Sequence, residues 1–301
     1  MKVSIIIPTY NRSSQITTLL KSLESQTYKD FEVIVVNDGS SDNTLETLNN
    51  FKADSLLNIT IINSPNKGRA GSRNLGSKQA NGDLLIFFDD DVRPSKSCVD
   101  SHVQFHKLHG ENNILGGACF YDDSKFKDDF NFFRKEMESS WYQKTNKYLK
   151  SESLRINGAN FSIHRNIFEG VNGFDERLTD KEDFALAYRV HKIFKTQVYF
   201  SRDTWVYHDD FKGLKDYINR AIESRKAELE MLNLYSDLKE LDPKRFITKP
   251  SFLKSFFFNF FKLKRVIDFC DSNQNFLLLP KFIRYKFYDF IITANVAYGI
   301  Y

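Results

Sequence analysis

The chain has 301 residues, of which 41% are hydrophobic and 27% charged, so it can bury a large core and is neither a disordered tail nor a small disulfide-stabilised domain. Its 43 basic and 39 acidic residues nearly balance, which argues against a surface built to bind nucleic acid. The three cysteines are odd in number and lack metal-ligand spacing, which indicates a reducing, cytoplasmic compartment and no zinc site.

The first apolar run predicts a strand and not a targeting segment. It stops at Pro8, too early for the apolar region of a signal peptide. No later run approaches the ~18 apolar residues of a membrane span.

Four short apolar runs alternate with segments of helical period in the first ninety residues. The runs are VSIII (3–7), FEVIVV (31–36), NITII (58–62) and DLLIFF (83–88). Between the first two, apolar residues fall at i, i+3, i+4 and i+7, at Ile16, Leu19, Leu20 and Leu23. This alternation predicts an α/β fold with a doubly wound, mostly parallel sheet.

Three more helices are expected in the same stretch. The second crossover has Leu45, Leu48 and Phe51 on one face, and Ser41 or Asp42 is its expected N-cap. Residues 68–80 form the third. Pro94 is expected to open a fourth, at the first helical position, where its missing N–H costs nothing.

Polar segments follow all four strands, at the sheet edge where α/β proteins bind ligands. They are PTYNR (8–12), NDGSS (37–41), NSPNKGR (63–69) and DDD (89–91). Together they offer hydrogen-bond donors, carboxylates and an aromatic side chain. This combination predicts a nucleotide site.

Asp89, Asp90 and Asp91 place three carboxylates at the mouth of a buried strand, where like charges repel unless a cation or hydrogen bonds neutralise them. If the chain stays extended, Asp89 and Asp91 point to the same side. Such a pair suits Mg²⁺ or Mn²⁺. The alternative is a solvated acidic turn that caps the next helix.

Asp38 ends the second strand, a position from which an acidic side chain commonly reaches a ribose or base. The alternative is an Asx-turn in the NDGSSD loop. The chain has no G-x-G-x-x-G after the first strand and no G-x-x-x-x-G-K-[ST], which argues against a dinucleotide dehydrogenase and a P-loop enzyme.

Seven strings occur in a recognisable order and spacing. They are SIIIPTYNR, VVNDGSSDNT, NKGRAGSRNLG, GDLLIFFDDD, GANFSIHR, GFDE and KEDFALAYR. Over residues 1–210 the chain therefore resembles the family 2 glycosyltransferases with a GT-A fold. The resemblance implies a donor site made of Pro8, Thr9, Tyr10, Asn11, Asp38, Asn66, Arg73, Asp89 and Asp90. Within this set it implies that Asp89 contacts the ribose.

The resemblance also implies the catalytic and metal residues. Glu182 and Asp183 match the acidic catalytic motif, in which Asp183 is the general base. From the residues alone, the pair starts an amphipathic helix with Asp180 as N-cap, and simple capping is the alternative. The helix dipole would lower the pKa of Asp183 unless burial offsets it.

His208 closes the strand-like TWVYH, so it and Asp91 could hold the cation together with two diphosphate oxygens. Packing at a strand end is the alternative. The resemblance places residues 157–160 at the donor sugar, although a glycine-containing strand start explains that segment nearly as well.

The predicted function is inverting, metal-dependent transfer of a sugar from a nucleotide sugar, most simply a UDP-sugar, to a glycan or lipid-linked acceptor. The chain lacks the Q-x-x-R-W motif and the membrane spans of processive synthases, which favours addition of one or a few sugars. Two alternatives are a haloacid-dehalogenase-like phosphatase and a non-catalytic nucleotide-binding or membrane-adaptor protein. The phosphatase is disfavoured because its nucleophile usually closes the first strand.

A composition change divides the chain into a catalytic domain, 1–212, and a helical region, 213–301, which is basic and Phe-rich from about residue 249. Phe252, Phe256, Phe260, Leu263 and Ile267 form one apolar stripe, whereas Phe258 and Phe261 share the opposite, basic face. Aromatic and basic residues on one face predict contact with an anionic membrane through residues 252–290, at the inner face of the cell membrane. Packing of the stripe on the catalytic domain, or on a second subunit of a homo-oligomer, is the alternative.

Overall fold

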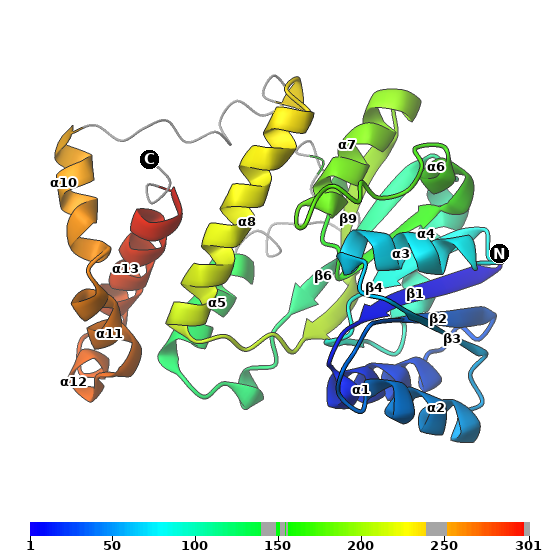
Figure 1. The fold of residues 1–301 in the computed structure, drawn as a ribbon, viewed down its shortest axis with the longest axis horizontal. Helices are drawn as coiled ribbons and strands as arrows, with labels where there is room; N and C mark the ends of the chain where they lie inside the picture. The colour runs from blue at the N-terminus through cyan, green and yellow to red at the C-terminus, as the bar shows by residue number, and fades with distance from the viewer. Residues whose placement is uncertain (140–148, 151–153, 155, 239–251, 298–301) are drawn as a thin grey trace. The chain divides into compact units, whose positions relative to one another are not determined.

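The computed structural model describes residues 1–139, 149–150, 154, 156–238 and 252–297, and its chain forms two compact units (Figure 1). The first unit is Met1–Tyr121 with Trp141–Asp209, and the second is Asp122–Ser140 with Asp210–Tyr301. The division predicted from sequence, 1–212 and 213–301, does not include residues 122–140 in the second unit.

The first unit contains a nine-stranded mixed sheet within the described residues, in the order β3-β2-β1-β4-β8-β6-β9-β5, with β7 paired to β9. Its strands are β1 (Val3–Thr9), β2 (Phe31–Asp38), β3 (Ile59–Ser64), β4 (Leu84–Phe88), β5 (Val92–Pro94), β6 (Asn113–Phe120), β7 (Leu149–Lys150), β8 (Asn160–His164) and β9 (Gln197–His208). The first four strands run parallel, and β8 is inserted antiparallel between β4 and β6.

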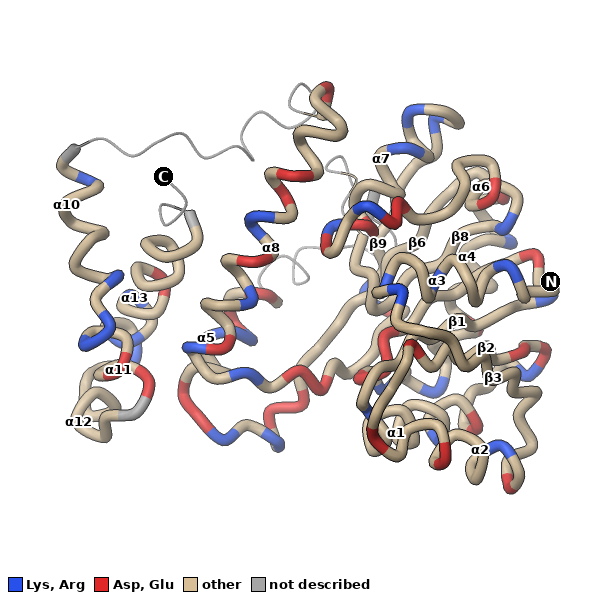
Figure 2. The backbone as a smooth tube through the Cα atoms, in the orientation of Figure 1, with Lys and Arg blue, Asp and Glu red and all other residues tan. Residues whose placement is uncertain are grey.

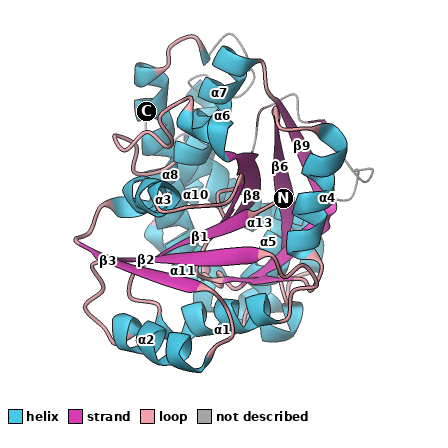
Figure 3. Cartoon of the chain, turned by 90° about the vertical axis from the view of Figure 1, so that its right-hand side faces the viewer, coloured by secondary structure: helices cyan, strands magenta, loops and turns pink. Residues whose placement is uncertain are grey.

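Helices cover both faces of the strands β1 to β4. They are α1 (Ser13–Glu24), α2 (Thr44–Asp54), α3 (Gly68–Lys78), α4 (Cys98–His109), α6 (Arg165–Glu169) and α7 (Glu182–Phe194). Helices α1 and α2 lie on one face of these strands and α3 on the other (Figure 3). Strand order reverses between β1 and β4, which places a ligand crevice at their carboxyl ends.

The predicted strands and the first crossover helix are confirmed. Strand β4 is fully buried, and the four apolar residues predicted on one face of α1 are all buried against the sheet. Burial on both faces explains why β1, β2 and β4 read as continuous apolar runs, whereas the edge strand β3 is only partly buried.

Two predicted helix starts are wrong. The N-cap of α2 is Asn43, and Asp42 accepts hydrogen bonds from the backbone N and hydroxyl of Thr44. Pro94 belongs to β5 and pairs with Val206, while the next helix begins at Cys98. A proline is tolerated there because β5 is an edge strand.

The second unit is helical. Its elements are a 3-10 turn (Asp123–Lys125), α5 (Asp129–Ser139), α8 (Leu214–Leu234), α10 (Phe252–Phe261), α11 (Lys264–Ser272), α12 (Gln274–Leu277), α13 (Lys281–Ile292) and a π-helical turn (Thr293–Ala297). Its core joins Phe130 and Phe133 of α5 to Leu214 of α8 and Tyr288 of α13. In the part of the chain that the structure describes, every helix is too short or too polar to cross a bilayer.

The predicted apolar stripe over 252–267 is wrong in both continuity and direction. The helix ends at Phe261, and a second one begins at Lys264. Phe261 is only 5% exposed because it packs against Phe287 and Phe290 of α13, whereas Phe256 is 78% exposed. Residues 239–251, where the basic stretch was expected to begin, lie outside the described residues.

Candidate active site

The loop after β1 is tied to the loop after β2. Asn11 has a left-handed backbone (φ 53°), and its Oδ1 accepts a hydrogen bond from the backbone N of Ser41 at 2.8 Å. Pro8 is buried in β1, and Thr9 is 2% exposed. The ring of Tyr10 is 49% exposed and so remains accessible to a ligand.

Asp38 joins the loops after β2 and β3. It is 5% exposed, and its Oδ1 accepts a hydrogen bond from the backbone N of Lys67 at 2.6 Å. Gly39 (φ +76°) lies so close to Asn66 that an added Cβ would stand 2.9 Å from the Asn66 backbone N. The three loops therefore form one polar rim, and the nucleotide contacts expected of Asp38 and Asn66 stay predictions.

The three aspartates after β4 do not continue the strand. The chain turns at Asp90 and Asp91, so the expectation of an extended segment with Asp89 and Asp91 on one side does not hold. Asp89 lies 2.6 Å from a guanidinium nitrogen of Arg73, whereas Asp91 lies 3.2 Å from His208. The turn therefore separates two carboxylates that an extended strand would place together.

Asp90 is hydrogen-bonded inside the turn. The hydroxyl of Thr9 donates to its Oδ2 at 2.7 Å. Burial, followed by the charge of neighbouring Asp91, raises the pKa of Asp90 to about 7. This carboxyl group fixes the β1 loop against the turn after β4.

Asp91 and His208 meet because β5 and β9 pair directly beside them. Val92 pairs with His208, and the backbone N of Asp209 donates to the Asp91 carbonyl at 2.9 Å. The His208 Nε2 lies 3.2 Å from the Asp91 Oδ1, and the Arg12 guanidinium lies 4.0 Å from the Oδ2. Sequence reasoning missed Arg12, although it closes the PTYNR string.

The Asp91–His208 pair fits part of a cation site. A carboxylate oxygen and an imidazole nitrogen are suitable ligands for Mn²⁺, and the carboxylate also suits Mg²⁺. Among the described residues, no group of three or more His, Cys, Asp or Glu side chains is placed to hold a metal. Further ligands would therefore come from the donor diphosphate or water.

Arg73 is the buried centre of the site. Its side chain is 1% exposed and lies 2.5 Å from Glu182, in addition to its contact with Asp89. A third, longer hydrogen bond at 3.3 Å goes to the Gly158 carbonyl. The predicted nucleotide contact of Arg73 stays a prediction, but its observed partners are two carboxylates.

Asp183 is held by backbone N–H groups. Its Oδ2 accepts from Gly158 at 2.8 Å and its Oδ1 from Phe184 at 2.7 Å. Burial, followed by the charge of Glu182, raises the pKa of Asp183 to about 6, so burial outweighs the opposite effects of Lys181, Arg73 and the Gly158 N–H. The expected N-cap Asp180 is wrong: the N-cap is Lys181, in a left-handed conformation (φ 65°).

Asn160 belongs to a buried polar hub. It is fully buried, and its Oδ1 lies 2.9 Å from the His102 Nε2. The other His102 nitrogen contacts the Ser162 hydroxyl, which also contacts His106. The Asn160 side chain is therefore occupied by contacts inside the protein, and the donor-sugar contact expected of residues 157–160 stays a prediction. No short motif marks such a hub, because its members come from β8 and α4.

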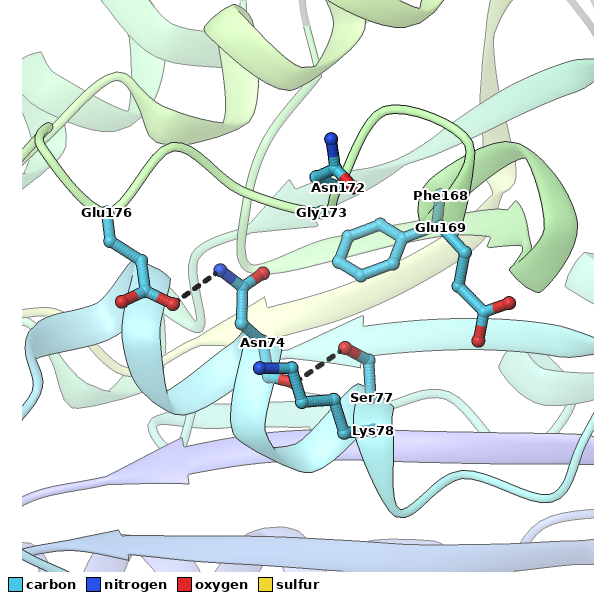
Figure 4. Close-up of a pocket in the computed structure, with 8 residues that line it drawn as sticks. All are labelled: Asn74, Ser77, Lys78, Phe168, Glu169, Asn172, Gly173 and Glu176. Atoms are coloured by element: carbon cyan, nitrogen blue, oxygen red, sulfur yellow. Dashed lines mark hydrogen bonds between the residues drawn. The ribbon is translucent and has the colours of Figure 1, made fainter.

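A separate pocket of about 350 Å³ lies beside α3 (Figure 4). Its lining residues are Asn74, Ser77, Lys78, Phe168, Glu169, Asn172, Gly173 and Glu176, which include none of the predicted site residues. Asn74 donates at 2.9 Å both to the Phe174 carbonyl and to Glu176, and so holds the segment that leads into α7.

Residues 4–171, more than half of the chain, match the family model of glycosyl transferase family 2, and the chain belongs to this family. Among curated relatives, the glycosyltransferase YfnE of Bacillus subtilis is 40% identical over 122 residues, which are 40% of this chain and 30% of YfnE. A Campylobacter jejuni GalNAc(5)-diNAcBac-PP-undecaprenol beta-1,3-glucosyltransferase is 25% identical over 213 residues, 67% of this chain and 66% of the relative. The chain thus spans about a third of the first relative and about two thirds of the second.

Solved structures agree with the fold. TarS 1–349 of Staphylococcus aureus in complex with UDP-GlcNAc has a TM-score of 0.57 at 20% identity, covering 100% of this chain and 92% of that chain. Mannosyltransferase PcManGT of Pyrobaculum calidifontis in complex with GDP-Man and Mn²⁺ has a TM-score of 0.61 at 18% identity, covering 78% and 64%. The predicted family and GT-A fold are therefore confirmed.

Proposed function

We propose that the chain is an inverting, non-processive glycosyltransferase that transfers a sugar from a UDP-sugar to a hydroxyl of a glycan or lipid-linked acceptor. The observation that carries the proposal is the burial of Arg73 between Asp89 and Glu182. This contact brings the acidic turn after β4 and the acidic start of α7, which are far apart in sequence, to one place at the sheet edge.

Similar proteins support the substrate classes. Solved TarS structures contain UDP or UDP-GlcNAc, and the mannosyltransferase contains GDP-Man and Mn²⁺. The Campylobacter relative is named for an acceptor attached to PP-undecaprenol. These names support a nucleotide-sugar donor, a divalent cation and a lipid-linked acceptor for this chain.

The polar rim would bind the donor. Thr9, Tyr10 and Asn11 would take the nucleotide from the β1 side, and Asp38 and Asn66 from the β2 and β3 side. Pro8 sets the direction in which the first loop leaves the sheet, because its ring fixes the backbone φ. Asp89 would contact the ribose. Asp90 would act on the donor through the β1 loop that it holds.

Asp91 and His208 would hold Mn²⁺ or Mg²⁺. When bound, such a cation supplies positive charge that stabilises the negative charge developing on the leaving diphosphate. The pairing of β5 with β9 supports this assignment, because it brings the backbones of Asp91 and His208 close together. A thermal-shift comparison with Mn²⁺, Mg²⁺ and chelator tests this assignment, since a ligand that binds only the native state raises its melting temperature.

Asp183 is the proposed general base. It would accept the proton of the acceptor hydroxyl while that oxygen attacks the anomeric carbon from the face opposite the diphosphate. A pKa of about 6 leaves the carboxylate mostly ionised at neutral pH but closer to the working pH than an ordinary aspartate. Glu182, the other member of the acidic pair, holds Arg73 beside the base.

Hydrolysis or transfer of UDP-sugars, with and without Mn²⁺ and with a polyprenyl-diphosphate glycan as acceptor, tests the function. Anomeric analysis of the product tests inversion. UDP binding without turnover on any sugar and acceptor would favour the non-catalytic nucleotide-binding alternative.

The proposed location is the inner face of the cell membrane, with α10 in contact with anionic lipid. Leu253, Phe256, Phe257 and Phe260 fall at i, i+3, i+4 and i+7 and are 79%, 78%, 46% and 52% exposed. Lys and Arg residues occur along α10, α11 and α13 (Figure 2). An exposed aromatic stripe among basic residues suits the interface of an anionic bilayer.

Co-sedimentation with phosphatidylglycerol vesicles tests this location. Phe256→Ser with Phe260→Ser should weaken binding, and Leu108→Ser, which changes a 72% exposed apolar residue on α4, is the matched control. Phe258 and Phe261 are unsuitable for this test because they belong to the core of the second unit. Absence of binding together with dimers that the double variant dissociates would instead assign the stripe to a second copy of the chain.

A further inference from the structure

Arg73 combines almost complete burial with several carboxylate neighbours. Its side chain is 1% exposed, between Asp89 at 2.6 Å and Glu182 at 2.5 Å. Its guanidinium also lies 5.4 Å from the ring centre of Phe174, a stacking distance. A side chain enclosed in this way has little surface left for a nucleotide.

The turn at Gly158 links Arg73 to Asp183. The Gly158 carbonyl accepts from Arg73, and its N–H donates to Asp183. A Cβ added at Gly158 would lie 3.0 Å from the Arg73 Nη2 and 3.4 Å from the Asp183 Oδ2. The Arg73 guanidinium and the Asp183 carboxylate therefore contact the carbonyl and the N–H of the same residue, Gly158.

We propose that Arg73 is a positioning residue for sugar transfer. By bridging Asp89 and Glu182, it keeps Asp183 at a fixed position relative to the carboxyl end of β4. Its positive charge also offsets the negative charge around the base. The inference rests on the proposed function, because it takes Asp183 as the base. It also gives Glu182 a role as the counter-charge of Arg73 and not as a second proton acceptor.

The charges that face Asp183 have opposite effects on its ionisation. Glu182 raises its pKa, whereas Lys181 and Arg73 lower it. Its two hydrogen-bond donors, the backbone N–H groups of Gly158 and Phe184, do not titrate. Neutralising either member of the Arg73–Glu182 pair should therefore move the acid limb of the pH–rate profile, in opposite directions.

The experiment compares pH profiles of kcat/KM for the wild type, Arg73→Gln and Glu182→Gln at saturating Mn²⁺. We expect the acid limb to move up by roughly 1 pH unit in Arg73→Gln and down by a similar amount in Glu182→Gln. Arg73→Lys keeps the charge but cannot bridge two carboxylates in the same way, so it should leave the limb in place and lower kcat more than it changes the KM for the donor. If Arg73 had a purely structural role, all three variants would be slower, but the acid limb would not move in opposite directions in Arg73→Gln and Glu182→Gln.

The inference is overturned if the acid limb of the pH–rate profile stays in place, or if it moves in the same direction in Arg73→Gln and Glu182→Gln. It is also overturned by an Arg73→Gln variant that loses only UDP affinity by calorimetry, because Arg73 would then be a donor ligand. If circular dichroism shows that Arg73→Gln does not fold, the direction of the Glu182→Gln shift decides. Failure of the wild type to transfer or hydrolyse any UDP-sugar would overturn the proposed function instead.

Discussion

Asp183→Asn separates binding from chemistry at the proposed base. The amide keeps the shape of the side chain but cannot accept the acceptor proton, and general-base catalysis typically contributes about 100-fold to 10,000-fold. We therefore expect kcat to fall by ~100-fold or more, with UDP affinity unchanged.

The stability change follows from two opposing effects. Both carboxylate oxygens of Asp183 accept backbone N–H groups, whereas the amide has one oxygen, so one N–H loses its partner at a cost of about 1–3 kcal/mol. The carboxyl pKa is raised to about 6 in the folded protein, so the ionised form costs about 3 kcal/mol of stability above pH 6, a cost that the amide removes. The effects nearly cancel at pH 7.5. The variant should melt at the same temperature as the wild type or slightly higher.

The sign of the pH dependence gives a second check. Because the pKa is raised on folding, the native state binds more protons than the unfolded state between about pH 4 and pH 6, so Asp183 destabilises the wild type progressively as the pH rises through this window. Any excess stability of Asp183→Asn should therefore shrink at about pH 4.5. Melting curves at both pH values, UDP calorimetry and transfer rates make up the assay. Retained kcat with lost UDP affinity would refute the reasoning, as would a fall of 10 °C or more in melting temperature at pH 7.5.

Three further predictions concern the metal pair, the histidine hub and the sheet. Asp91→Ala should lower transfer by about 100-fold or more by removing a cation ligand, and near-normal transfer by the folded variant in excess chelator would contradict the assignment. Burial lowers the pKa of His102 to about 4 and that of His106 well below its usual value, so the unfolded state gains more protons than the native state as the pH falls below ~6.5. As the pH falls below ~6.5, the unfolding free energy from denaturant titrations should therefore fall by about 1.4 kcal/mol per pH unit for each histidine. If His102→Gln leaves the slope of unfolding free energy against pH unchanged, His102 is not a source of this pH dependence. Gly117→Ala should lower the unfolding free energy by about 1–3 kcal/mol or more, because the added Cβ would lie 2.2 Å from the Thr204 carbonyl oxygen. In the control Gly116→Ala, the nearest atom to the added Cβ is 3.7 Å away, so the same titration should show a smaller loss.

Local hydrophobic patterns in the sequence are sufficient to predict most of the strands and helices of the catalytic fold. The strands β1, β2 and β4 are buried on both faces, so their apolar runs are unambiguous, whereas the edge strand β3 is only partly buried. The carboxyl ends of these four parallel strands must share one sheet edge. Shared strand ends alone predict that Asp38 and Asp89 lie at that edge. The antiparallel insertion of β8 was not predicted, because a single strand of NFSIH carries no information about its neighbours.

Errors arose where a long-range contact decided the local geometry. The turn after β4 follows from the pairing of Val92 with His208, over a hundred residues later. Helix α10 has phenylalanines on several sides, and only its packing on α13 decides that Phe261 is buried and Phe256 is not. The burial of Arg73 likewise depends on a glutamate more than a hundred residues away.

Helix α5 has a consequence for biosynthesis. Its Phe130 and Phe133 pack against Leu214 and, still later in the chain, Tyr288. At a synthesis rate of about 5–20 residues per second, Tyr288 follows Phe133 by roughly 8–30 s. Throughout that interval the nascent chain carries an aromatic helix that still lacks its partner in α13. Chaperone capture should therefore concentrate on residues 129–139 of the growing polypeptide, and a stop codon after residue 212 should yield an aggregating product and not a free catalytic domain.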